Sequence, residues 1–140
     1  MNIESKQVVV SAQAQKVYDF VGDFNNLSRI IPTGNGQISN FSCTADRCSF
    51  NVGGFMQITL TYLERTPYSQ VVLGPAADAS SPMPFKLKVN IKSEGMDSSR
   101  LTLSFDMEGG NMMMNMMLKP KLKDAADKMA EMLQYYCNAL

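Results

Sequence analysis

Strict alternation of apolar and polar residues in three segments constrains the fold more than any other feature of this chain. The segments are residues 56–62, 85–92 and 101–107. A period of two places successive side chains on opposite faces of a strand, so each segment is predicted to be a β-strand with one apolar and one polar face. Short turns favour an antiparallel meander, because parallel neighbours need long crossovers. The apolar face gathers Met56, Ile58, Leu60, Tyr62, Phe85, Leu87 and Leu103.

The last part of the chain changes to a helical period. Apolar residues such as Met129 and Leu133 recur every three or four positions, and charged residues cover the opposite face. Lysines are electrostatically unfavourable at the N-terminus of a helix, which carries partial positive charge, so the helix is expected to begin near Asn111, before the lysines. Pro120 is expected to produce a kink or a short break. This helix must bury its apolar stripe, and the apolar face of the sheet is the only large surface available for it.

Two short helices are predicted after a first strand at residues 3–10. Ser11 offers a hydroxyl that can cap the first helix, and Gly22 is a natural stop. Asn25 can cap the second helix, and Pro32 ends it because proline disfavours helical geometry in the preceding residue. These helices can close one end of the space between the sheet and the long helix.

Shorter segments complete the sheet. Residues 37–43, 47–52 and 70–73 are each predicted to be a strand. The chain is therefore predicted to form a single α+β domain over residues 1–140, with a curved antiparallel sheet of six to seven strands around the long C-terminal helix. A curved sheet need not pack flush against such a helix, which leaves room for a bound molecule.

Composition excludes several function classes. The chain has no histidine, which removes an imidazole base, a Ser-His or Cys-His nucleophile and a histidine-ligated metal. Thirteen Lys and Arg offset thirteen Asp and Glu, which argues against a nucleic-acid partner. No apolar run approaches the roughly 20 residues of a membrane helix, and no signal peptide is visible. We expect a cytoplasmic protein with no integral membrane association, no metal and no cofactor.

The number and placement of the cysteines are also consistent with a cytoplasmic protein. Cys43 and Cys48 flank a predicted turn at Ala45 and Asp46, which would place them opposite one another. A disulfide is geometrically conceivable, but in a reducing compartment two ordinary thiols are expected. The three cysteines, with Cys137, fall short of the four ligands of a structural zinc site.

Methionine is unusually frequent, with seven of the twelve residues lying between Met112 and Met132. The cluster that includes Met113 and Met117 is interpreted either as an adaptable lining or gate at one end of an apolar cavity, or as a surface for a partner. The alternative is that these residues fill the core beneath the helix, which is the commoner outcome for methionine stripes.

The order of elements resembles the helix-grip layout of the START-like superfamily (SRPBCC), which includes birch-pollen-allergen-like proteins, polyketide cyclases and lipid-transport domains. The chain is similar to a small, largely uncharacterised bacterial branch of it. The resemblance implies a hydrophobic ligand between sheet and helix, and some members are cyclases or co-chaperones. The motifs that carry it are Val10-Ser11-Ala12, Val17-Tyr18-Asp19-Phe20, Asp23-Phe24-Asn25-Asn26-Leu27 up to Pro32, Asp46-Arg47-Cys48-Ser49-Phe50, Pro84-Phe85 and Met129-Ala130-Glu131-Met132-Leu133.

We expect the protein to bind or transport a small hydrophobic molecule, lipid- or polyketide-like, between the sheet and the C-terminal helix, without catalysis. Tyr62 is the polar group most suited to orient that ligand, because a buried phenol needs a hydrogen-bond partner. The candidate ligand-binding residues are Met56, Ile58, Leu60, Tyr62, Phe85, Leu87, Leu103, Met113, Met117, Met129 and Leu133.

Two alternatives stay open. A cyclase- or dehydratase-like enzyme would use a pocket tyrosine or glutamate for proton transfer, and Glu64 falls on the apolar parity of its strand after Tyr62. A solvated carboxylate at a strand end is the interpretation of Glu64 that the sequence favours. The second alternative is a protein-interaction module with a filled core, which would form a homodimer through its outer sheet or its methionine segment.

Overall fold

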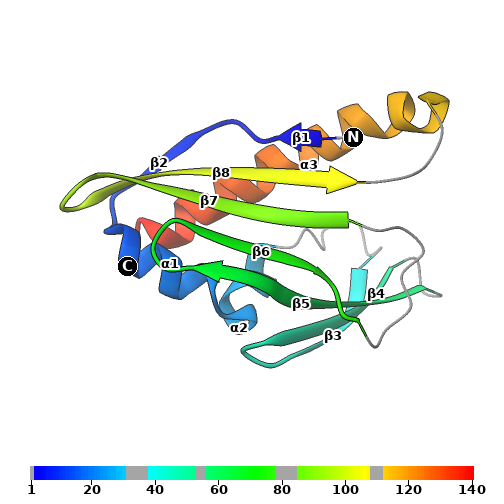
Figure 1. Ribbon diagram of the computed structural model, residues 1–140, viewed down its shortest axis with the longest axis horizontal. Helices are drawn as coiled ribbons and strands as arrows, with labels where there is room; N and C mark the ends of the chain where they lie inside the picture. Colours follow the sequence, from blue (N-terminus) through cyan, green and yellow to red (C-terminus); the bar gives the residue numbers. More distant parts are fainter. Residues whose placement is uncertain (1, 31–37, 53–55, 78–84, 108–111) are drawn as a thin grey trace.

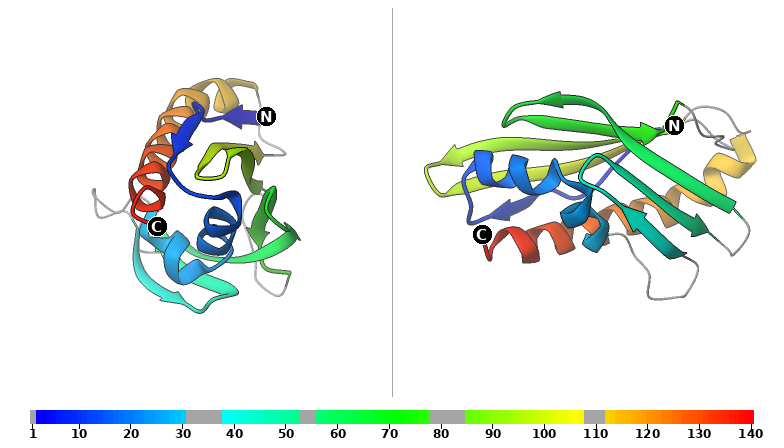
Figure 2. Two further views of the ribbon diagram at one scale, coloured as in Figure 1. Left: turned by 90° about the vertical axis from the view of Figure 1, so that its left-hand side faces the viewer. Right: turned by 90° about the horizontal axis from the view of Figure 1, so that it is seen from below.

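The computed structural model describes residues 2–30, 38–52, 56–77, 85–107 and 112–140. These residues form one antiparallel sheet that curves around the helices (Figures 1 and 2). The strands are β1 (Asn2–Glu4), β2 (Val8–Val10), β3 (Ile38–Cys43), β4 (Arg47–Val52), β5 (Met56–Thr66), β6 (Gln70–Pro75), β7 (Phe85–Gly95) and β8 (Ser98–Met107). The helices are α1 (Ala14–Val21), α2 (Phe24–Leu27), the 3-10 helix η1 (Ser28–Ile30) and α3 (Met112–Cys137).

The strands follow the order β1-β8-β7-β6-β5-β4-β3 across the sheet, and β2 also pairs with β8. From β3 to β8 this is the predicted meander. The predicted α+β fold, with a curved antiparallel sheet, two short helices and a long C-terminal helix, is confirmed. Within the described residues, the sheet has eight strands rather than six or seven because the first predicted strand is divided into β1 and β2.

An extra residue in the N-terminal segment divides that first strand. Ile3 pairs with Phe105 and Val8 with Leu101, so five steps along the first segment match four steps along β8. One residue is therefore left over between the two strands, as in a β-bulge. The backbone N–H of Lys6, which lies in this interval, donates to α3 instead of to the sheet.

The first short helix begins later than predicted. Its N-cap is Gln13, whose side chain makes no capping hydrogen bond, so the predicted Ser11 cap is wrong. The Ser11 backbone N–H donates instead to Asn138 Oδ1 at 2.8 Å. The predicted stop at Gly22 is confirmed, and its N–H donates to the Tyr18 carbonyl at 2.8 Å.

The second short helix is capped by Asp23, whose carboxylate accepts the Asn25 backbone N–H at 2.8 Å. The predicted Asn25 cap is therefore wrong by two positions. An aspartate at the N-cap also places negative charge where the helix backbone is positive. Pro32, the predicted end of this helix, lies outside the described residues.

The long helix α3 begins beside its predicted start and continues through Pro120. It packs against β8, β1 and β2 and meets η1 (Figure 1). In the part of the chain that the structure describes, it makes no comparable contact with β3, β4, β5 or β6. Among these residues, neither α3 nor any shorter helix has the apolar length of a membrane span.

A second bulge lies in β5. Tyr62 pairs with Leu73 and Glu64 with Val72, so Leu63 is the extra residue and the alternation of faces shifts beyond it. The strand continues beyond the alternating segment 56–62, to Thr66.

The two cysteines of the β3–β4 hairpin are joined in a disulfide. Cys43 and Cys48 lie directly opposite each other in the register, as predicted, with their Cα atoms 4.0 Å apart. The interpretation of this pair as two free thiols is wrong. Disulfides persist mainly in oxidising compartments, so the prediction of a cytoplasmic location loses the support that it drew from these residues.

Candidate functional site

The candidate site is the inner face of the sheet, where it faces α3. Leu60, Leu87 and Leu103 lie buried on this face, in β5, β7 and β8. Met129 and Leu133, in the C-terminal half of α3, are buried in the same core cluster. The structure therefore brings these five predicted residues together, as core rather than as exposed lining.

Three further predicted residues pack on the edge of this cluster. Ile58, Tyr62 and Phe85 contact the core but remain partly exposed. Met56 stands at the start of β5, where its backbone pairs with Val52.

The cover over the inner face is incomplete at one end of the strands. Phe85 pairs with Met107 at the outermost described rung between β7 and β8, and both side chains are half-buried. Phe105, two residues further in along β8, is also half-buried. Four residues in along each strand, Val89 and Leu103 pair with each other and are fully buried. The exposure of apolar side chains on this face of β7 and β8 therefore increases toward the Phe85–Met107 end.

Strands β3 and β5, farther across the sheet from β8, also carry partly exposed apolar residues on the inner face. Ile58 in β5 and Ile38 in β3 are half-buried, although both pack against the core. Among the described residues, α3 makes no contact with β3 or β5 comparable to its contact with β8. We call the apolar margin formed by Ile38, Ile58, Phe85, Phe105 and Met107 the open end.

The other end of the inner face is closed by the short helices, as predicted. α1 packs against β6, β7 and β8, and α2 follows it directly. Most apolar side chains of these helices are almost completely buried in the core cluster. They are Val17, Phe20, Val21, Phe24, Leu27 and, from η1, Ile30.

Tyr62 joins the sheet to these helices. Its hydroxyl donates to the Val21 carbonyl at 2.5 Å, and its ring centroid lies 4.5 Å from that of Phe24. Burial raises the pKa of Tyr62 well above its usual value of 10, because the charged phenolate is poorly solvated there. The hydroxyl is thus committed to the backbone, and the prediction that it orients a ligand is not supported.

The bulge in β5 decides which charged residue turns toward Tyr62. The Arg65 guanidinium lies 4.2 Å from the centroid of the Tyr62 ring. It also donates to Asp46 Oδ1 at 2.8 Å and to the Gly22 carbonyl at 3.3 Å. Glu64 is exposed, which confirms its interpretation as a solvated carboxylate. The expectation that Glu64 shares the apolar parity of the strand is wrong because the extra residue reverses that parity.

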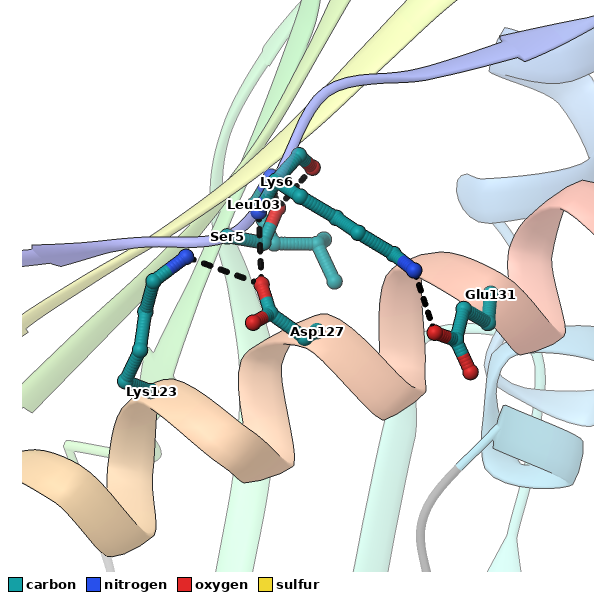
Figure 3. A network of polar contacts seen from close by, with 6 residues as sticks. All are labelled: Ser5, Lys6, Leu103, Lys123, Asp127 and Glu131. Carbon is teal, nitrogen blue, oxygen red and sulfur yellow. Dashed lines mark hydrogen bonds and ion pairs between the residues drawn. The ribbon is translucent and has the colours of Figure 1, made fainter.

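A polar stripe on α3, which the sequence pattern did not reveal, holds the helix against the N-terminal segment (Figure 3). Asp127 Oδ1 accepts the Lys6 backbone N–H at 2.6 Å and the Lys123 ammonium at 3.0 Å. These two donors hold the pKa of Asp127 below its usual range. Glu131, one turn further, forms an ion pair with the Lys6 side chain.

The same stripe continues toward the C-terminus. Gln134 Nε2 donates to the Val9 carbonyl at 2.9 Å, and Asn138 Oδ1 accepts the Ser11 backbone N–H at 2.8 Å. The polar residues at 127, 131, 134 and 138 recur every three or four positions, which places them on one helix face. This spacing could have indicated the polar stripe. However, a helix face exposed to solvent shows the same spacing as one that hydrogen-bonds to the backbone of another segment.

Four methionines in the first turns of α3 do not fill the core. Met112, Met113, Met116 and Met117 are between 69% and 79% exposed, so the core-filling interpretation of these residues is wrong. Met113 and Met117 are also not brought against the buried inner face. The alternative that this segment is a surface for a partner stays open.

An open hollow of about 490 Å³ lies between α1, η1 and the last residue of the chain. None of the predicted ligand-binding residues lines it. Its walls are Lys16, Asp19, Phe20, Asn26, Arg29 and Leu140.

Solved structures of other proteins share this architecture. A START superfamily protein from Mycobacterium smegmatis has a TM-score of 0.73 at 15% identity, covering 99% of this chain and 97% of its own. A conserved protein from Geobacillus kaustophilus has a TM-score of 0.69 at 12% identity, covering 99% and 96%. The di-domain ARO/CYC BexL from the BE-7585A biosynthetic pathway has a TM-score of 0.61 at 12% identity, covering 94% of this chain and 45% of that one.

No family model and no curated protein sequence matches the chain. Structural likeness at such low identity establishes the fold alone, because one fold hosts many functions. The chain has the START-like (SRPBCC) helix-grip fold, and the predicted resemblance is confirmed at that level.

Proposed function

We propose that this protein binds a small hydrophobic molecule between the inner face of the sheet and α3, without catalysing a reaction on it. The observation that carries the proposal is the open end, where Ile58, Phe85 and Phe105 remain partly exposed beside a fully buried core. The fold supports it, since the structural neighbours include a START superfamily protein and an ARO/CYC protein of a biosynthetic pathway.

Burial of apolar surface would supply the affinity. A ligand that covers the exposed parts of Ile58, Phe85 and Phe105 gains roughly 25 cal/mol for each Å² of apolar surface removed from water. Ligand sites are typically concave and mostly apolar, with few polar groups. Because the Tyr62 hydroxyl already donates to Val21, we expect recognition to depend mainly on apolar shape.

The enzyme alternative has less support than binding. It required a pocket tyrosine or glutamate that is free to transfer a proton. The Tyr62 hydroxyl is committed to a backbone carbonyl, and Glu64 is exposed. Neither Tyr62 nor Glu64 therefore has the geometry that proton transfer needs.

The binding proposal is tested by native mass spectrometry of the purified protein and by titration with a fluorescent fatty acid. We expect saturable uptake of the probe in the wild type and its loss in Ile58→Trp, where the larger ring occupies the open end. Gln57→Trp is the matched control, because Gln57 is the exposed neighbour on the opposite face of β5. Circular dichroism establishes that both variants fold.

The filled-core alternative makes the opposite prediction. If the wild type carries no ligand and takes up no probe, the binding proposal is wrong and the protein-interaction module remains. Equal uptake by the wild type and Ile58→Trp would also contradict binding at the open end.

A further inference from the structure

The first two turns of α3 expose four methionines to solvent. Met112, Met113, Met116 and Met117 are 79%, 73%, 70% and 69% exposed, and we call them the methionine surface. Figure 1 shows these turns projecting beyond the end of β8, away from the body of the sheet. Methionine is normally a buried residue, and its flexible apolar side chain suits adaptable binding surfaces. Four such side chains on adjacent turns form an exposed apolar patch, which marks an interaction site.

Along α3, the charged residues that follow this patch are positive as far as Lys123. The sequence between Glu108 and Asp124 contains three lysines and no acidic residue. Lys119 and Lys121 are exposed, and neither is ion-paired within the described part of the chain. Lys123 is held by Asp127. The partner that complements this segment is therefore apolar and negatively charged.

We propose that the methionine surface docks this protein onto an anionic lipid bilayer. The methionines would enter the interface between head groups and acyl chains, and the lysines would contact the lipid phosphates. A bilayer supplies the apolar layer and the dense negative charge together. This is association with the membrane surface, and it differs from spanning, for which no described helix has the apolar length.

The position of the patch fits this role. Only residues 108–111 separate Met107, at the open end of the inner face, from Met112 at the start of α3. Docking would therefore bring the open end close to the lipid. The docking inference goes beyond the proposed function and stands on exposure and charge alone, so it holds whether or not a ligand enters the sheet.

Co-sedimentation of the full chain with vesicles tests the proposal. We expect binding to vesicles that contain phosphatidylglycerol in phosphatidylcholine, weaker binding to pure phosphatidylcholine, and loss of binding at high salt. Met113→Ser/Met117→Ser is expected to weaken binding on the order of tenfold through lost apolar burial. Lys119→Gln/Lys121→Gln is expected to weaken binding to the anionic vesicles by a similar factor.

The other end of the molecule provides matched controls. Met96, in the turn between β7 and β8, is 84% exposed, and Lys92 is an exposed lysine of β7. Figure 1 shows that this turn lies at the opposite end from the start of α3. Met96→Ser and Lys92→Gln should leave vesicle binding unchanged, and all variants should fold because each replaced side chain is exposed.

Three outcomes would overturn the proposal: no binding of the wild type to anionic vesicles, equal binding by wild type and variants, or equal loss in the controls. A second copy of the chain is the competing partner for the patch. If light scattering shows that Met113→Ser/Met117→Ser dissociates a dimer while vesicle binding persists, the patch is a dimer interface. Uptake of the fluorescent fatty acid reports the proposed ligand binding separately, so the two ideas fail independently.

Discussion

The hydroxyl group of Tyr62 donates a 2.5 Å hydrogen bond to the carbonyl oxygen of Val21 and so joins β5 to the last residue of α1. The same ring packs on Phe24 and lies beneath the Arg65 guanidinium. One side chain of the inner face therefore holds both short helices in place. This structural role explains how the closed end of the site is maintained.

Replacing Tyr62 with phenylalanine tests that role. The variant removes the donor to a partly buried carbonyl, and we expect a loss of about 1–2 kcal/mol in the free energy of unfolding. Urea denaturation followed by circular dichroism measures it. Tyr68→Phe is the control, because Tyr68 is 49% exposed. An unchanged urea midpoint for Tyr62→Phe would contradict the structural role, and fatty-acid uptake should persist in the variant.

Cysteine reactivity is predicted to distinguish the free thiol of Cys137 from the disulfide-bonded pair Cys43 and Cys48. Burial raises the pKa of Cys137 to about 12, so its reactive thiolate is scarce at neutral pH. Without reductant, we expect a chromogenic disulfide reagent to label no cysteine in the folded protein and one in denaturant. Reduction should then release the remaining two, because Cys43 and Cys48 are paired. Two or more reactive thiols in the folded, unreduced protein would contradict this assignment.

Acid should weaken the attachment of α3 to the N-terminal segment. The Lys6 backbone N–H and the Lys123 ammonium hold the pKa of Asp127 below its unfolded value. The carboxylate therefore stabilises the fold above about pH 4, and this contribution is lost as the pH falls through the folded pKa. The site is open to solvent, so the effect is expected to be modest.

Asp127→Asn isolates this contribution, because it keeps the shape and removes the charge. Unfolding free energies of the wild type and the variant should differ at pH 7 and converge toward pH 3 in urea titrations. Asp124→Asn is the matched control, since Asp124 forms an ion pair with exposed Lys128 on the same helix. A constant difference between wild type and Asp127→Asn across this range would show that the charge plays no part.

The sequence predicted the sheet and the long helix because their periodicities are strong and local. Residues such as Leu87 and Leu103 alternate with polar neighbours over whole strands, and only one arrangement buries them all. The periodicity of the sequence did not predict the shifts in strand register. The extra residue near Lys6 and the bulge at Leu63 each depend on how two distant segments pair, and a period of two carries no mark of a one-residue insertion.

The candidate site was predicted less well than the fold. Apolar periodicity assigned Met113, Met117 and Leu133 to one site, but only Leu133 is buried. Whether a turn of α3 lies over the sheet depends on where β8 ends relative to that turn, and the apolar periodicity of α3 does not predict this. The polar stripe on α3 was missed because its partners on the N-terminal segment include backbone groups, which have no sequence signature.

Close packing at Gly74 offers a test of how β6 supports the open end. A Cβ atom at this position would lie 2.8 Å from Leu63 Cδ1 and 3.0 Å from the Phe85 carbonyl oxygen. We expect Gly74→Ala to lose about 1–3 kcal/mol in unfolding free energy from overpacking, although alanine in a strand regains about 0.5–1 kcal/mol of chain entropy.

A second substitution separates the two contacts. The Leu63 side chain can move, whereas the Phe85 carbonyl belongs to the backbone of β7 and must shift with its strand. Adding Leu63→Ala should therefore restore only part of the stability lost in Gly74→Ala, relative to Leu63→Ala alone, in a double-mutant cycle measured by urea denaturation. Complete restoration would show that the leucine alone limits the space, and that β7 can be displaced at Phe85 without cost.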